Sequence, residues 1–230
     1  MNPDQTGRTL TGLGPHDAPM SSTTSTQPTL DPRPILDRAL ASSAAVIAGV
    51  RPDQLTLPTP CSEMDVRALL SHLVGVLGRI AALGTGDDPF AVTETLAPDD
   101  GWSDTWAAAG ARAAAGWSDD AVLERAMALP WIQGTGAEIL TSYFSELTVH
   151  TWDLAQATGQ HPHWDDTVVT AALEARKILP AEDRRALFEQ ISAASGLDEV
   201  AIPFGEAVTV AADAPAIDRL VAWNGRDPQR

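Results

Sequence analysis

The residues best suited to chemistry in this sequence are Glu146 and His150, which lie four positions apart in a segment with helical spacing of apolar residues. Residues four apart on an α-helix lie one above the other on the same face, so both side chains could bind a single ion. Asp153 lies three residues further on and shares that face. His72 is the only other histidine in a segment with a strong helical pattern. Two imidazoles and one carboxylate are typical of catalytic zinc, which keeps a coordination position open for water or substrate.

The same spacing has a plainer interpretation. A Glu–His pair on an exposed helix face stabilises that helix by only about 0.2–0.5 kcal/mol and binds no ion. At about 100° per residue, Glu146 and His150 fall at the edge of the apolar stripe of their helix, and His72 falls well away from the centre of its own. Ligands in such positions can meet in a solvent-accessible cleft between helices, but not in the middle of a sealed core. An open cleft is what a catalytic metal requires.

Other polar residues have roles that the sequence leaves open. Asp153 could accept a hydrogen bond from a metal ligand, or it could pair with an arginine such as Arg67 on a neighbouring helix. Cys61 directly precedes a predicted helix, where a thiolate would be stabilised, but a role in anchoring the loop is favoured over a nucleophile. His161 and His163 lie in a turn and are interpreted as a solvated pair rather than as metal ligands.

Four of the seven tryptophans fall close together in the middle of the chain. Tryptophans at such spacing are more often anchors of the core than walls of a pocket, so we predict that they are buried. The best candidate for a pocket wall among them is Trp131. The four are Trp102, Trp106, Trp117 and Trp131.

The elements that must position these side chains are mainly helices. Long helices with short connections predict an all-α fold, an antiparallel bundle. Residues 207–210 are the only run typical of a strand. We predict a disordered tail over residues 1–31, a helical bundle over 32–196 and a small C-terminal strand-and-helix appendage over 197–230. The predicted helices cover residues 34–48, 63–83 (capped by Ser62), 103–115, 118–128, 135–158, 165–179, 181–194 and 214–223.

Composition and charge exclude several classes of function. Fifteen basic against thirty-one acidic residues give a net charge of −16, which disfavours nucleic acids and anionic membrane surfaces as partners. A single cysteine excludes an internal disulfide and a cysteine-based zinc cluster, so any metal must be held by histidine and carboxylate. The sequence shows neither a secretory signal pattern nor an obvious membrane span, and we therefore expect a cytoplasmic protein.

Residues 59–75 and 146–155 resemble the two signatures of the mycothiol-dependent maleylpyruvate isomerase N-terminal domain, a member of the DinB-like superfamily. Residues 213–228 are similar to the tail of a short subfamily of such metal-binding proteins, and the resemblance as a whole covers residues 33–228. It implies a DinB-like four-helix bundle with extra helices that binds one divalent ion, most often zinc. The matching ligands are His72, Glu146 and His150, with Asp153 as a candidate for supporting them.

The resemblance also implies a low-molecular-weight thiol as cosubstrate, mycothiol or a similar molecule, which the metal activates for attack on a small electrophile. Homodimers occur among such bundles. Met64 stands where the family often has tryptophan, and only about thirty-five residues follow the last bundle helix, where the isomerases carry a larger domain. An S-transferase is therefore favoured over a cis-trans isomerase. The alternatives are a non-catalytic metal-binding accessory or sensor module, and a helical interaction protein without an ion.

Overall fold

The structure is a computed structural model that describes residues 31–93, 95–194 and 204–229. Within these residues the chain is mostly helical, with one small hairpin and three short 3-10 helices. The α-helices are α1 (Arg33–Ala48), α2 (Val66–Thr85), α3 (Trp102–Gly116), α4 (Asp120–Glu124), α5 (Gly136–Thr158), α6 (Asp166–Ala175), α7 (Arg184–Ala194) and α8 (Ala216–Trp223). The strands are β1 (Ala126–Leu129) and β2 (Ile132–Thr135), and the 3-10 helices are η1 (Pro52–Gln54), η2 (Pro89–Ala91) and η3 (Arg176–Ile178).

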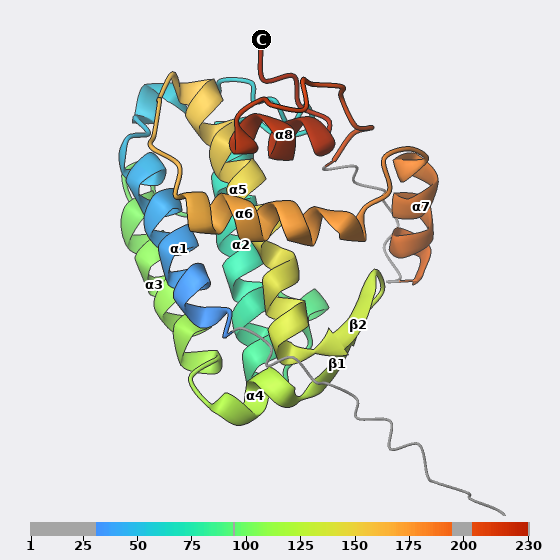
Figure 1. Cartoon of the computed structure of the whole chain (residues 1–230). Helices are drawn as coiled ribbons and strands as arrows, with labels where there is room; N and C mark the ends of the chain where they lie inside the picture. Colours follow the sequence, from blue (N-terminus) through green and yellow to red (C-terminus); the bar gives the residue numbers. More distant parts are fainter. Residues whose placement is uncertain (1–30, 94, 195–203, 230) are drawn as a thin grey trace, which may run out of the picture.

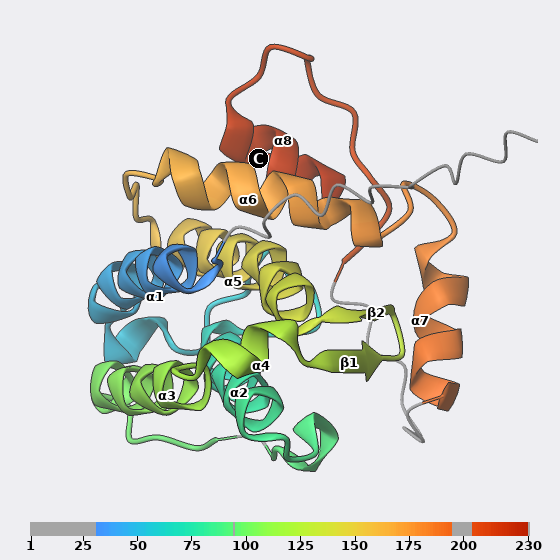
Figure 2. The same cartoon turned by 60° about the horizontal axis from the view of Figure 1, so that its bottom comes forward.

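Helices α1, α2, α3 and α5 form a four-helix bundle in which each helix packs against two of the others (Figure 1). Helix α2 packs against α3 and α5, and α1 packs against the same two helices. Helix α6 crosses the face formed by α1 and α5, and α8 lies on α6, so the molecule has four layers (Figure 2). The all-α bundle predicted from the sequence is confirmed.

The two helices that carry the candidate ligands have strong local stop and start signals. The carboxylate of Asp65 caps α2 by accepting a hydrogen bond from the Ala68 amide, and Thr135 and Glu138 form a capping box at the start of α5. Both helices end at a glycine with positive φ, Gly86 and Gly159, as left-handed caps require. The predicted cap at Ser62 is wrong, because residues 61–64 form a turn in which the Met64 amide donates to the Cys61 carbonyl, and α2 begins only at Val66.

Two predicted elements differ in the structure. The helix expected over residues 118–128 is shortened to α4, and the chain continues into the β1–β2 hairpin instead (Figure 2). Pro130 lies in the two-residue turn between Leu129 and Ile132, where its fixed φ suits a turn. The strand expected over residues 207–210 is also wrong: the segment pairs with no strand in the described residues, and the Val208 amide donates to the carbonyl of Ala222 instead.

The C-terminal segment shares the core of the bundle. Leu220 and Val221 of α8, and Phe204 before it, belong to the same buried hydrophobic cluster as the bundle helices. The predicted tail falls almost wholly on residues 1–30, outside the described residues. Residues 204–229 thus contribute side chains to the hydrophobic core of the bundle.

The tryptophans behave as predicted for core residues. Trp102, Trp106 and Trp117 are buried, and the indole of Trp117 donates a hydrogen bond to the carbonyl of Ile80, 2.7 Å away. Trp131 is half-buried and meets the ring of Phe90 edge-on, with centroids 6.2 Å apart.

Helix α2 is long and apolar enough, by length and composition, to cross a membrane, although no span is obvious in the sequence. It has 20 residues and a mean hydropathy of 1.5, but 61% of that stretch is buried inside the molecule. A central helix of a bundle needs the same composition, because its neighbours cover it on most sides. The length and hydropathy of α2 are therefore weak grounds for a membrane span.

Two glycines of α2 have opposite surroundings and provide a test of the packing. A Cβ on Gly84 would lie 2.6 Å from the backbone of Gly116 in α3, whereas a Cβ on Gly75 would meet no atom within 4 Å. We expect Gly84→Ala to lower the free energy of unfolding by about 1–3 kcal/mol, as overpacking does. We expect Gly75→Ala to raise it by about 0.5–1 kcal/mol, because alanine favours the helix. Urea unfolding of both variants would contradict the described packing if the two changes had the same sign.

Candidate metal centre

The predicted ligands come from two helices of the bundle that pack against each other. His72 lies on α2, and Glu146 and His150 lie one turn apart on α5. The Nε2 atom of His72 is 2.9 Å from Oε1 of Glu146, and the Nε2 atom of His150 is 3.7 Å from the same oxygen. The two imidazole rings lie 4.8 Å apart and nearly perpendicular. One donor atom from each residue thus lies within 4.8 Å of the other two, close enough to hold one ion.

The cluster lies at the edge of the core. The side chain of His150 is fully buried, while the side chains of His72 and Glu146 are 19% and 21% exposed. This agrees with the helical phase of the three residues in the sequence, which predicts a cleft open on one side. A small molecule could approach the cluster from the side of His72 and Glu146.

A buried ion pair between Asp153 and Arg226 fixes the orientation of the His150 ring. Its Nδ1 atom lies 3.0 Å from Oδ2 of Asp153, and both side chains are fully buried. Arg226, in the segment after α8, donates from Nε to Oδ1 of Asp153 at 3.0 Å and from Nη2 to Oδ2 at 2.6 Å. Phe204 stacks on the His150 ring at 5.3 Å, and the guanidinium of Arg226 lies over Phe204.

The sequence suggested two partners for Asp153, a metal ligand and an arginine, and the structure shows one of each kind, although the arginine is not Arg67. Asp153 accepts a hydrogen bond from a candidate ligand and also pairs with Arg226. Arg67 pairs instead with Asp99 at the surface, at 2.7 Å. Arg226 was not predicted as a partner of Asp153, from which it is 73 residues away in the sequence. The signal that could have found it is the similarity of residues 213–228 to the tail of a metal-binding subfamily.

The protonation states favour metal binding at neutral pH. Burial lowers the pKa of His150, against the opposing hydrogen bond to Asp153, so the ring is neutral. Burial opposes ionisation of Glu146, but the hydrogen bond from His72 and the nearby positive charge hold its pKa at about 2. Burial also opposes ionisation of Asp153, yet the hydrogen bonds from His150 and Arg226 keep its pKa below the ordinary value. Because the Asp153 carboxylate can only accept, His150 carries its proton on Nδ1 and leaves a lone pair on Nε2.

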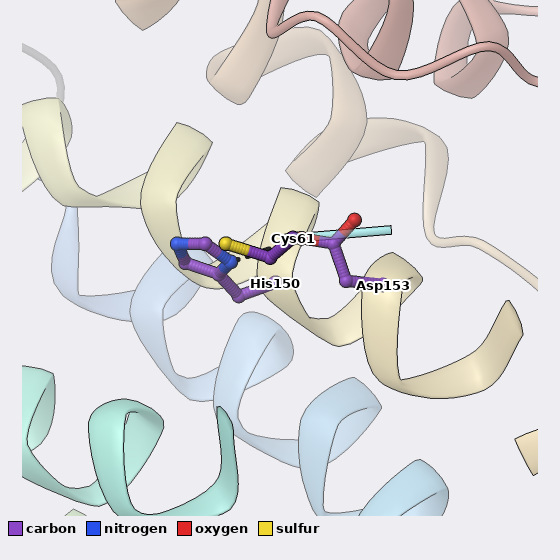
Figure 3. Close-up of side chains that lie close together, drawn as sticks. All are labelled: Cys61, His150 and Asp153. Carbon is purple, nitrogen blue, oxygen red and sulfur yellow. Dashed lines mark hydrogen bonds and ion pairs between the residues drawn. The ribbon is translucent and has the colours of Figure 1, made fainter. Parts of the chain in front are cut away.

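Cys61 lies against the buried side of His150 and forms a second possible ligand set with His150 and Asp153 (Figure 3). All three side chains are buried, and their donor atoms lie within 4.8 Å of one another. Burial raises the pKa of the Cys61 thiol to about 11, so it carries its proton at neutral pH and is not poised as a nucleophile. An ion on this side would also have to displace the hydrogen bond between His150 and Asp153.

The set on the opposite side of the imidazole fits a divalent ion better. Nε2 of His150 is a buried nitrogen without a hydrogen-bond partner in the described residues. Such an orphaned acceptor costs stability unless something binds it. It faces a carboxylate and a second imidazole, which together match the two-histidine, one-carboxylate chemistry of zinc. His161 and His163 are exposed, and neither belongs to a cluster of potential ligands in the described residues.

Comparison with known proteins places the chain in a family. The model of the mycothiol maleylpyruvate isomerase N-terminal domain matches residues 36–155, which include His72, Glu146 and His150. Two uncharacterized proteins of Mycobacterium tuberculosis, from strains CDC 1551 / Oshkosh and ATCC 25618 / H37Rv, are each 30% identical to the chain over 200 residues. Each alignment covers 86% of this chain and 98% of the relative. No solved structure matches this chain. The chain belongs to the mycothiol maleylpyruvate isomerase N-terminal domain family.

Proposed function

We propose that the chain binds one divalent metal ion, zinc, through His72, Glu146 and His150, and that it is a thiol-dependent S-transferase using mycothiol or a similar small thiol. The observation that supports it most is the buried Nε2 atom of His150, which has no hydrogen-bond partner in the described residues and faces the carboxylate that His72 also contacts. Family membership supports the proposal of a thiol cosubstrate, since the description of the matched family names mycothiol.

The residues around the site prepare it for this role. When bound, the ion supplies Lewis acidity, which lowers the pKa of a coordinated thiol and favours the nucleophilic thiolate. Asp153 and Arg226 hold the His150 ring so that Nε2 stays aimed at Glu146. Phe204 covers the ring and excludes water from that side. The partly exposed side chains of His72 and Glu146 leave an approach for the thiol and the electrophile.

The thiol must come from a cosubstrate. Cys61 is the only cysteine of the chain, and it is buried with a raised pKa. In the transfer, the sulfur of the external thiolate forms a bond to an electrophilic carbon, and the leaving group departs with the electron pair of the bond that breaks. In an isomerisation the same sulfur adds to an activated double bond and leaves again. A cytoplasmic location, where such thiols stay reduced, belongs to the same proposal.

The first test is metal content. We expect purified wild-type protein to carry about one zinc per chain, and His72→Ala, Glu146→Ala and His150→Ala to lose it, because each removes one of three ligands. Elemental analysis after gel filtration measures this. His163→Ala is the matched control, since His163 is exposed and outside the cluster, and it should keep its zinc. Zinc retained by a variant lacking all three ligands would contradict the site.

The second test separates the ligands from the residues that position them. We expect Asp153→Asn and Arg226→Lys to keep the metal but to weaken its affinity by about 10–100-fold, because the hydrogen bond that orients His150 is lost or distorted. Competition with a coloured chelator gives the dissociation constant. Arg67→Lys serves as the control, because Arg67 pairs with Asp99 at the surface. An unchanged affinity in both Asp153→Asn and Arg226→Lys would show that the buried pair only stabilises the fold.

The third test addresses the thiol. Mycothiol added to cobalt-substituted protein should produce a thiolate-to-metal absorption band that saturates, and the band should persist in Cys61→Ala, because the sulfur comes from outside. Turnover of electrophilic acceptors in the presence of mycothiol would then separate transfer from isomerisation by product analysis. A metal-loaded protein that binds no thiol would instead be an accessory or sensor module.

A further inference from the structure

The side chain of Arg184, at the start of α7, is fully buried, yet its guanidinium forms no ion pair within the described residues. Its Nε atom donates to the carbonyl of Pro180 at 2.6 Å, and its Nη1 atom donates to the carbonyl of Gly205 at 2.5 Å. Burial lowers the pKa of Arg184, because the charged form is costly there. An apolar side chain would fill the space at lower cost, so the two hydrogen bonds need an explanation.

An indole ring of α8 holds the guanidinium of Arg184 in place. The guanidinium carbon lies 5.6 Å from the centroid of the Trp223 ring, a cation–π contact. The Nε1 atom of Trp223 in turn donates to the carbonyl of Arg176, directly after α6, at 3.1 Å. Helix α7 stands apart from the four-helix bundle (Figure 1). The position of the Arg184 guanidinium is therefore set by α6 and α8, not by α7 alone.

The backbone of Gly205 is held from two sides. On one side its carbonyl accepts the hydrogen bond from Arg184, and the backbone amide of Arg184 donates to the carboxylate of Glu206 at 3.0 Å. On the other side lies Gly225, on which a Cβ would lie only 2.7 Å from the Cα atom of Gly205. These contacts leave residues 205 and 206 little freedom, and Phe204 directly precedes them.

Phe204 connects this backbone to the candidate metal centre. Its ring is 6% exposed and stacks on the His150 imidazole, with centroids 5.3 Å apart and planes inclined by 22°. The guanidinium of Arg226 lies 5.2 Å from the centroid of the same ring. Because a ring can reach only as far as its backbone allows, the hydrogen bond from Arg184 to Gly205 helps to set where the Phe204 ring meets His150.

We propose that Arg184 is a positioning residue of the candidate metal centre, which fixes the backbone at Gly205 and so keeps the Phe204 ring stacked on His150. Arginine suits this role because one planar group can donate to two carbonyls and also stack on an aromatic ring. The apolar cover of a metal ligand controls how far water reaches it. The effect on metal binding rests on the proposed function, whereas the stacking of the rings needs no metal.

The stacking can be measured in protein treated with a chelator. NMR of the full chain labelled with ¹³C-histidine detects the carbon-bound ring protons of His150, which are assigned by their loss in His150→Gln. The ring current of Phe204 displaces these resonances, and Phe204→Leu should remove the displacement. We expect Arg184→Met to remove most of it, because the carbonyl of Gly205 loses its donor. Arg184→Lys should retain part of it, because lysine keeps the charge and a donor.

Two matched controls and a double variant separate positioning from a general loss of stability. Arg185→Met removes an exposed arginine next to Arg184, and Gly205→Ala adds a Cβ that would meet no atom nearer than 3.8 Å. Both should leave the His150 resonances in place. The double variant Arg184→Met/Phe204→Leu should match Phe204→Leu, because Arg184 acts through Phe204. Thermal unfolding shows which variants are folded, and Arg184→Lys carries the comparison if Arg184→Met is not.

The role of Arg184 is overturned if the His150 resonances stay in place in its folded variants, or if the double variant displaces them further than Phe204→Leu does. Zinc titration then tests the link to the metal, and we expect Arg184→Met and Phe204→Leu to weaken binding by about tenfold. Unchanged zinc affinity in both would contradict that link. Displaced resonances in a protein that binds no zinc would refute the proposed metal function and leave the positioning of Phe204 standing. Zinc binding with unmoved resonances would do the reverse.

Discussion

The buried carboxylate of Asp153 is the group on which the arrangement of the site depends. An ionised carboxylate without solvent is costly unless it is paired and hydrogen-bonded, and Asp153 meets both conditions through Arg226 and the Nδ1 proton of His150. Removing the side chain of Asp153, Arg226 or His150 leaves either a buried charge without its partner or an imidazole ring without a fixed orientation. The pair therefore connects the C-terminal segment to α5, and the orientation of a candidate metal ligand depends on packing 73 residues away.

This connection explains why the C-terminal segment folds back on the bundle. Helix α8 packs on α6, which itself crosses α1 and α5, and Leu220 and Val221 complete the same hydrophobic cluster. Hydrophobic burial brings the segment into place without specifying direction, whereas the two hydrogen bonds from Arg226 to Asp153 fix its register. Phe204 then stacks on the His150 ring. The C-terminal segment thus contributes Phe204 and Arg226 to the surroundings of His150.

The sequence predicted the parts of the molecule that depend on local patterns. Helical periodicity located the helices, and the four-residue spacing of Glu146 and His150, together with the resemblance that included His72, identified three side chains that the structure brings together. Periodicity could not show that residues 126–135 form a hairpin, because short runs of apolar residues fit either a helix or a strand. It could not pair Asp153 with Arg226 either, since that contact depends on how α6 and α8 cross the bundle. Arg67 lies on a neighbouring helix and was therefore the arginine that the sequence suggested, but it lies at the surface, where it pairs with Asp99.

The two nitrogens of His150 decide which of the two neighbouring ligand sets can hold an ion. Nδ1 is committed to Asp153, so a metal on the side of Cys61 would have to break that hydrogen bond, weaken the ion pair with Arg226 and remove the proton of a thiol whose pKa is about 11. A metal at Nε2 breaks none of these contacts and satisfies a buried atom that otherwise has no partner in the described residues. The same hydrogen bond that disfavours the buried set makes Nε2 a better donor, because Asp153 draws on the Nδ1 proton and raises the electron density of the ring. Cys61 then helps to pack the closed side of the imidazole, and the open side, between His72 and Glu146, is where an external thiol would enter.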